Sequence, residues 1–339
     1  FAPGVQDERE RTELMLQACH EILALGWRMG GSEVEAATVF AEGRSLNESL
    51  GDRAATALLV GRYGLMRMSV AGSGSDYVRY GEEAALLAEG CGDPVLRAAV
   101  GTFPAFGHVF GGDGREMLRW SARVLDEVGT DDLLGRALLG WSPRISMLVV
   151  RARGFACMGR LQEARSQFNE TLRIAEESRE LEVLGWAIAL SADLPRLCGG
   201  GESGLERARR SLGIAEQSDN PSNQVIAYVA LGEAHLAEGQ PAAAREAVRE
   251  SLALARGHGV TKQTLPWSLA VLAEAALALG ERTEAIASAR EGIELGRAGG
   301  CGYYEAGAQL ALTAALLATD GVVPRAEIES ALARAEQLV

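Results

Sequence analysis

The sequence predicts an all-α protein, a right-handed α-solenoid of about eight helical hairpins stacked one after another. The first observation is a short phrase whose central small residue recurs after 40, 40 and 41 residues, at Ala175, Ala215, Ala255 and Gly296. The second is composition: 47% of the 339 residues are hydrophobic but only 5% are aromatic, which favours close helix packing through small side chains. A fixed period of this length is typical of units that bury their apolar faces only against their neighbours.

Residues that begin and end helices divide the chain at similar intervals. Ser32 and Glu35 form a capping box, and Asp93 and Asn220 each place a capping side chain before a proline. Seven helix ends are expected near small or left-handed positions, at Gly51, Gly92, Gly129, Ser178, Ser218, Gly259 and Gly299. The interval between the third and fourth ends is longer than the others, which predicts an irregular insertion.

We therefore expect a single helical-repeat array over residues 1–339. N-terminal repeats would occupy residues 1–130, the insertion 131–143, the clearest repeats 144–299, and a truncated C-terminal repeat 300–339. The chain lacks an initiating Met, and the last helix, which we expect to open at Pro324, shows no natural stop. Both ends are therefore predicted to be cuts within a longer protein.

The clearest unit shows how each repeat is built. A first helix is expected near 224–238, followed by a turn at Gly239 and a second helix that begins at Pro241, where the missing N–H of proline costs nothing. The second helix carries one apolar stripe, formed by Ala244, Val248, Leu252 and Ala255. This spacing of four, four and three residues is that of an amphipathic α-helix.

Two neighbouring units share bulky and small residues at matching positions. The first set is Tyr228, Leu231, Gly232, His235, Gly239, Ala244 and Val248; the second, 41 residues later, is Leu269, Leu272, Ala273, Ala276, Gly280, Ala285 and Ala289. The pattern resembles the tetratricopeptide repeat, although His235 and Ala276 replace its usual tyrosine and its period is about 34 residues. The resemblance implies a superhelix whose concave face is lined by the first helix of each hairpin.

A second resemblance covers most of the chain. Residues 14–52, with a leucine-rich helix, a Gly-Gly turn, an alanine-rich helix and a Ser-Leu-Gly-Asp exit, resemble the start of a helical region in large bacterial regulators. Residues 303–338 resemble its later part. In these regulators a class III nucleotide cyclase domain and an AAA-like ATPase domain precede the repeats, and LuxR-type ATPase regulators share the arrangement. The resemblance implies a regulatory domain of a cytoplasmic bacterial signalling protein.

Charge and motifs exclude several classes of function. A net charge of −13 argues against nucleic-acid binding, and no apolar run is long enough for a transmembrane helix. Lys262 is the only lysine and no Gly precedes it, so no Walker A loop occurs; the Gly-rich run at 199–204 is expected to be an inter-helix turn. The four histidines are far apart in the sequence, so we expect no metal site and no cofactor: His20, His108, His235 and His258. The five cysteines are also far apart and are expected to be free, buried thiols: Cys19, Cys91, Cys157, Cys198 and Cys301.

The candidate site is a pair of rows on the first helices of successive repeats. Using the 40-residue register, one row reads Arg153, Asp193, Glu233 and Glu274, and a second reads Ser146, Trp186, Ile226 and Trp267. Charged and aromatic side chains that converge on a groove are what peptide recognition uses. The alternative interpretation is that the carboxylates are solvated and that the tryptophans only pack between helices.

The functional hypothesis is a non-catalytic scaffold that binds a protein or peptide partner, including upstream domains of the same polypeptide. The binding residues would be Arg153, Trp186, Asp193, Glu233, Trp267 and Glu274. The alternative hypothesis is a domain that senses a small molecule or peptide in the concave groove, near the two tryptophans. Neither hypothesis involves a membrane or an active site.

Overall fold

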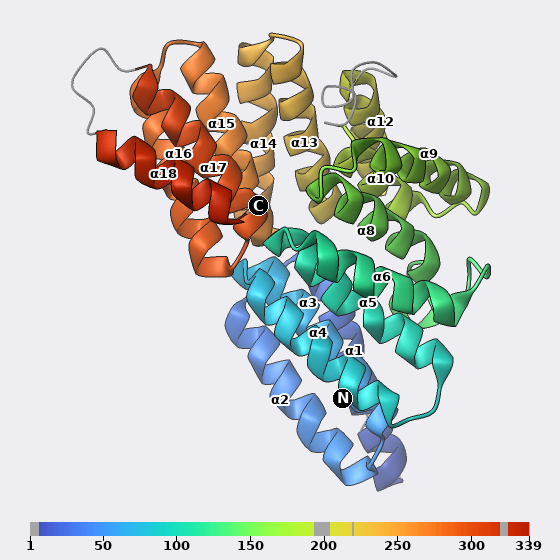
Figure 1. Ribbon diagram of the computed structural model, residues 1–339. Helices are drawn as coiled ribbons and strands as arrows, with labels where there is room; N and C mark the ends of the chain where they lie inside the picture. The colour runs from blue at the N-terminus through green and yellow to red at the C-terminus, as the bar shows by residue number, and fades with distance from the viewer. Residues whose placement is uncertain (1–6, 193–203, 219, 319–324, 339) are drawn as a thin grey trace.

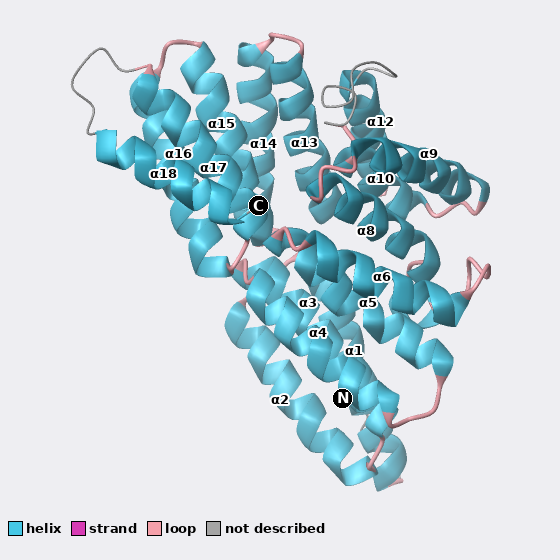
Figure 2. Cartoon of the chain, in the orientation of Figure 1, coloured by secondary structure: helices cyan, strands magenta, loops and turns pink. Residues whose placement is uncertain are grey.

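A computed structural model describes residues 7–192, 204–218, 220–318 and 325–338, which form helices joined by short turns (Figures 1 and 2). No strand occurs within these ranges. The prediction of an all-α solenoid is confirmed. The Gly-rich run at 199–204 lies outside the described residues except for Gly204, and so do Pro324 and Cys198.

Within the described residues, long helices pair into eight successive hairpins, while α7 (Arg136–Leu139) and the 3-10 helix η1 (Lys262–Thr264) lie between them. The pairs are α1 (Glu8–Met29) with α2 (Glu33–Leu50), α3 (Arg53–Ala71) with α4 (Gly74–Glu89), α5 (Pro94–Gly111) with α6 (Gly114–Val128), α8 (Pro143–Cys157) with α9 (Leu161–Glu177), α10 (Leu181–Leu190) with α12 (Gly204–Gln217), α13 (Pro221–Ala237) with α14 (Pro241–His258), α15 (Leu265–Ala278) with α16 (Arg282–Gly299), and α17 (Gly302–Leu317) with α18 (Arg325–Leu338).

The expected helix signals act as predicted, with one shift. Ser32 and Glu35 form the capping box of α2, and the Asn220 side chain accepts hydrogen bonds from the first backbone N–H groups of α13. Gly259 ends α14 in the left-handed conformation. The corresponding residue after α16 is Gly300 and not Gly299, because α16 continues one residue further than the sequence pattern indicated.

Small residues allow the helices to approach closely within and between hairpins. Ala244, Val248, Leu252 and Ala255 are all buried on α14, as the apolar stripe predicts. At Gly232 on α13 an added Cβ would lie only 2.5 Å from a methyl carbon of Val248, so any side chain there would separate the two helices. This explains physically why the repeat needs its Leu-Gly pair.

The first and last thirds of the solenoid meet end to end, which the repeat pattern did not predict. At the meeting point α1 contacts α13, α3 contacts η1, and α5 contacts α17. The Trp27 carbonyl accepts hydrogen bonds from the hydroxyls of Ser222 at 2.7 Å and Ser69 at 2.9 Å, and the Thr261 N–H donates to Ser69 Oγ at 3.0 Å. We call this contact the seam.

Glycines make the seam possible because backbone meets backbone there. An added Cβ at Gly299 would lie 2.1 Å from the Gly72 carbonyl oxygen, and one at Gly302 would lie 2.9 Å from the Gly111 carbonyl oxygen. The Cys301 thiol, fully buried between these two points, lies 3.6 Å from the Gly72 oxygen. Helix ends that are distant in the sequence therefore meet at the centre of the superhelix.

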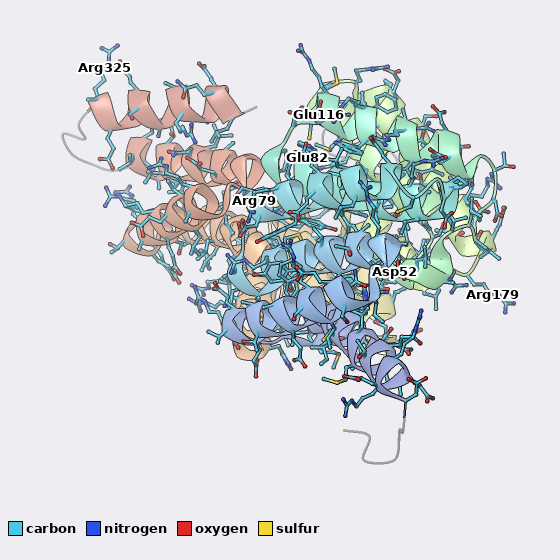
Figure 3. The ribbon with its side chains drawn as sticks, turned by 90° about the horizontal axis from the view of Figure 1, so that it is seen from below. Asp52, Arg79, Glu82, Glu116, Arg179 and Arg325 are labelled. Carbon is cyan, nitrogen blue, oxygen red and sulfur yellow. The ribbon has the colours of Figure 1, made fainter. Side chains whose placement is uncertain are left out.

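Charged side chains cover the outside of the solenoid. Figure 3 shows side chains projecting around the rim, where the labelled Arg179 and Arg325 lie at opposite sides of the view. Arginines also bridge successive outer helices, for example Arg249 to Glu284 and Arg256 to Glu291, each at 2.7 Å. Exposed pairs of this kind contribute little stability individually, so the repeat array is stabilised mainly by packing of its apolar faces.

Candidate functional site: an aromatic chamber and its charged mouth

A small chamber of about 80 Å³ lies at the centre of the closed superhelix. Helices of both halves line it. In a chain that is 5% aromatic, eight aromatic side chains line this one space: Trp27, Tyr77, Phe106, Phe110, Trp141, Trp186, Trp267 and Tyr304.

Three tryptophans from distant parts of the chain form the core of the chamber. Trp27 ends α1, Trp141 follows α7, and Trp186 lies on α10. Their ring centroids are 5.9–6.0 Å apart, with edge-to-face or tilted contacts between each pair. Such contacts stabilise a pair by about 0.5–1.5 kcal/mol beyond the area that they bury.

The polar atoms of the chamber fall into two groups. Trp186 Nε1 donates to Asn223 Oδ1 at 2.8 Å, and Trp267 Nε1 donates to Glu233 Oε1 at 2.7 Å. Four other buried polar atoms on residues that line the chamber have no hydrogen-bond partner: Trp27 Nε1, Trp141 Nε1, Thr261 Oγ1 and Gln263 Oε1. Unsatisfied buried groups are uncommon and each costs about 1–3 kcal/mol, so they point to water or a ligand.

A second cavity of about 320 Å³ adjoins the chamber, between α8, α13, α15 and α17. It is lined by the charged side chains Arg153, Glu233 and Glu274, and the exposed Glu274 lies at its outer side. Leu190, Trp267 and Tyr304 line both spaces. We call this second cavity the mouth, because it connects the chamber with the surface of the molecule.

Aromatic rings hold the charges of the mouth in place. The guanidinium carbon of the buried Arg153 lies 4.5 Å from the centre of the Tyr303 ring, a cation–π contact. Tyr304 stacks against Trp267 with ring centroids 5.4 Å apart. Burial raises the pKa of the Tyr304 hydroxyl well above its ordinary value, so that hydroxyl keeps its proton at neutral pH.

The structure gathers most of the residues that the sequence singled out. Arg153, Glu233, Trp267 and Glu274 surround the mouth, and Trp186 lies in the chamber behind it. Asp193 lies outside the described residues. In the second row, Ile226 also lines the chamber, whereas the Ser146 hydroxyl is buried against the Pro143 carbonyl at 2.9 Å.

The chamber and the mouth lie where the sequence predicted a concave groove. One part of the sequence interpretation needs correction. Cys19 and Cys301 are buried as expected, but Cys91 and Cys157 are only partly so. The sequence also missed Trp27, Trp141, Tyr303 and Tyr304, and the concentration of scarce aromatic residues was the only signal that could have indicated them.

The described residues also limit what the site can do chemically. Among them, no three His, Cys, Asp or Glu side chains come close enough to hold a metal ion. No helix in the described ranges is both long and apolar enough to cross a membrane. Among the described residues, the chamber and its mouth present aromatic faces, two carboxylates and one guanidinium.

Comparisons with known proteins identify the fold. No protein-family model matches the chain, and no curated protein matches it either. A Rap protein complexed with competence and sporulation factor is similar with a TM-score of 0.61 and 13% identity, over 97% of this chain and 90% of that one. NprR in complex with its cognate peptide NprX is similar with a TM-score of 0.56 and 13% identity, over 95% and 88%.

A third similar structure is larger than this chain. It is a signal transduction ATPase with numerous domains from Pyrococcus horikoshii, which carries a tetratricopeptide repeat sensor; the TM-score is 0.55 and the identity 15%. The match covers 98% of this chain but 46% of that protein. At these identities the likeness establishes a tetratricopeptide-like solenoid for this chain and nothing about its ligand.

Proposed function

We propose that this chain is a non-catalytic regulatory domain that binds a protein or peptide partner through the inner face of its solenoid. The observation that carries the proposal is the mouth, where Arg153, Glu233, Trp267 and Glu274 converge from three helices of different hairpins. Convergence of charged and aromatic groups on one concavity is typical of peptide recognition. Two similar structures are complexes with a signalling factor and with a cognate peptide, which supports this class of function.

The chemistry of the mouth favours a particular kind of partner. Among the described residues, two carboxylates and one guanidinium line the mouth beside an aromatic cluster. A segment that places a basic residue next to an aromatic or large aliphatic residue would complement both features. The parent protein would be a cytoplasmic bacterial signalling regulator with a nucleotide cyclase or ATPase output, and the sequence upstream of Phe1 tests that part directly.

A library of 12-residue peptides displayed on phage tests the proposed function. We expect enrichment of sequences that pair a basic residue with an aromatic one. The Glu233→Gln/Glu274→Gln double variant should weaken their binding about tenfold and flatten its dependence on salt, because screening acts mainly on exposed charges.

The matched control removes a carboxylate from the outer surface, at the exposed Glu294 on α16. The Glu294→Gln variant should bind the selected peptides as the unchanged chain does. Selection without enrichment, or equal binding by the double variant, would contradict a partner site at the mouth. Steady turnover of a nucleotide by the purified chain would contradict the non-catalytic role.

A second candidate function is sensing of a small molecule. The aromatic chamber favours it, because a small apolar cavity lined by a few unsatisfied polar atoms suits a compact ligand better than an extended peptide.

A further inference from the structure

We propose that a cleft between the first helices of the solenoid binds an apolar α-amino acid, with its carboxylate held by Arg62 and His20 and its ammonium group near Glu21. This cleft shares no lining residue with the chamber or the mouth, so the inference is independent of the function proposed for them. Three features of the cleft carry it: an apolar floor, a pair of poorly satisfied nitrogen-bearing side chains, and carboxylates at the rim.

The cleft has a volume of about 500 Å³ and lies between α1, the end of α2, α3, the start of α5 and α7. This volume falls within the range of roughly 300–1,000 Å³ that is typical of small-molecule sites. Residues on the α1 side recur with the period of a helix and therefore share one face of it. They are Arg9, Glu13, Leu16, Gln17, His20 and Glu21.

Leucines supply the apolar floor. Among the described residues, five leucines from five helices line the cleft: Leu16, Leu50, Leu58, Leu96 and Leu138. Leu16 and Leu96 are buried, and the other three are partly buried. Removing apolar surface from water is favourable, so this floor selects a ligand with an apolar side chain.

The guanidinium of Arg62 selects an anion. Its Nη2 donates to the Leu138 carbonyl oxygen at 2.7 Å, and it forms no ion pair with any residue in the described ranges. Burial lowers the pKa of Arg62, because a charge removed from water is costly without a partner. A ligand carboxylate would accept two parallel hydrogen bonds from the planar guanidinium and would supply that partner.

His20 lines the same cleft and adds a second nitrogen-bearing group. It is only 8% exposed, and within the described part of the chain its Nδ1 atom has no hydrogen-bond partner. Burial, and to a smaller extent the charge of Arg62, lowers the pKa of His20 to about 4, so its ring is neutral at pH 7. A neutral imidazole carries one N–H, which a carboxylate oxygen can accept. Unsatisfied buried polar atoms are uncommon and point to a ligand or water.

Carboxylates at the rim select a cation next to this anion. Glu21 is exposed and forms no hydrogen bond or ion pair with another described residue, and its charge acts on Arg62. Asp52, labelled in Figure 3, and Asp93 cap α3 and α5 through their Oδ1 atoms. The rim would repel a ligand with only a carboxylate, and Arg62 would repel a ligand with only an ammonium group. An α-amino acid carries both charges on one carbon atom, so each meets its opposite.

Isothermal titration of the full chain at pH 7 tests this with L-leucine and L-phenylalanine, the amide and the N-acetyl derivative of each, and glycine. We expect at least one of the two amino acids to bind. Its amide lacks the carboxylate, its N-acetyl derivative lacks the ammonium group, and glycine lacks the apolar side chain, so each should bind at least about tenfold more weakly. Equal binding of the amide or of the N-acetyl derivative would overturn the proposal, and so would absence of heat with both amino acids.

Two charge variants identify the group that each end of the ligand meets. In Arg62→Gln the advantage of the amino acid over its amide should fall to about threefold or less, because the two differ only at the carboxylate. In Glu21→Gln the advantage over the N-acetyl derivative should fall similarly. A purely structural role of these side chains would weaken all ligands equally, and unchanged ratios in both variants would overturn the proposal.

Exposed residues outside the cleft provide matched controls, namely Arg115 on α6 and Glu294 on α16. Arg115→Gln and Glu294→Gln should bind the amino acid as the unchanged chain does. Thermal unfolding confirms that each variant is folded, and the saturating amino acid should raise the melting temperature of the unchanged chain more than that of Arg62→Gln. Because Glu21 is exposed, its variant should fold even if Arg62→Gln does not. Full affinity in a folded Arg62→Gln variant would overturn the proposal.

Discussion

Replacing Gly299 by alanine should open the seam. Gly299 is the last residue of α16, and its φ is not left-handed, so its own backbone accepts an alanine without strain. The obstacle is the neighbouring half, because the new Cβ would lie 2.1 Å from the Gly72 carbonyl oxygen. An ordinary contact is about 3.4 Å, so the halves must separate locally by about 1 Å.

The size of the effect follows from two opposing contributions. Glycine to alanine in a helix stabilises by roughly 0.5–1 kcal/mol. Overpacking a close contact costs about 1–3 kcal/mol, and backbone atoms cannot move aside as a flexible side chain can. We therefore expect Gly299→Ala to lower the free energy of unfolding by about 1–2 kcal/mol.

Gly257 provides the matched control. It lies in the last turn of α14, one hairpin earlier, and an added Cβ there would meet no atom within 4 Å. Gly257→Ala should raise stability, so the two glycine-to-alanine changes should have opposite signs. Urea unfolding monitored by circular dichroism measures both.

Cys301 gives a local readout of the seam. Its thiol is fully buried, and burial raises its pKa to about 11, so it should react very slowly with a thiol reagent such as Ellman's reagent. Opening the seam in Gly299→Ala should accelerate labelling of Cys301, which mass spectrometry distinguishes from labelling of the partly exposed Cys91 and Cys157. If Gly299→Ala stabilises as much as Gly257→Ala and leaves Cys301 protected, the end-to-end closure is wrong.

Three further changes test other parts of the molecule. Ser69→Ala should lower the free energy of unfolding by about 1–3 kcal/mol, because it leaves the buried Thr261 N–H without an acceptor. Ser222→Ala removes a hydroxyl that donates to the Trp27 carbonyl and should cost about 1 kcal/mol. Equal losses of stability in urea unfolding would contradict this difference. Burial alone would raise the pKa of Glu305, but hydrogen bonds from two arginines outweigh burial, so the net pKa lies below its ordinary value. The stability that the Glu305 carboxylate contributes should therefore be present above pH 4.5 and lost as the pH falls. Acid titration of Glu305→Gln should lack this pH dependence. Burial, and to a smaller extent the charge of Arg62, lowers the pKa of His20 to about 4. As the pH falls, His20 therefore takes up a proton in the unfolded chain before it does so in the folded one, and the free energy of unfolding should fall by roughly 3 kcal/mol between pH 6.5 and 4. The His20→Leu variant should not show this loss.

The repeat itself was predictable because it is local. Residues at a fixed period, such as Ala215 and Ala255, sit at equivalent positions in α12 and α14, where each helix packs mainly on its sequence neighbours. Capping residues likewise act on the backbone beside them, so Ser32 and Asn220 mark helix starts directly. The register that follows from the period placed Arg153, Glu233 and Glu274 on the side of their helices that faces one cavity.

The seam and the chamber were not predictable from the same pattern. They depend on the pitch of the superhelix, which accumulates small rotations between hairpins and decides which distant helix ends meet. No periodic signal connects Trp27 with Trp186 or Gly72 with Gly299, because the members of each pair are separated by several repeats. In the sequence, Gly72 and Gly299 resemble ordinary glycines at helix ends. In the structure, they also allow the backbones of the two halves to come into contact across the seam.

Closure of the seam gives the chamber a way to act at a distance. The walls come from both halves, since Trp27 and Phe106 belong to the first hairpins while Trp267 and Tyr304 belong to the last. Any occupant that contacts both sets stabilises the closed superhelix relative to an open one by its differential binding free energy.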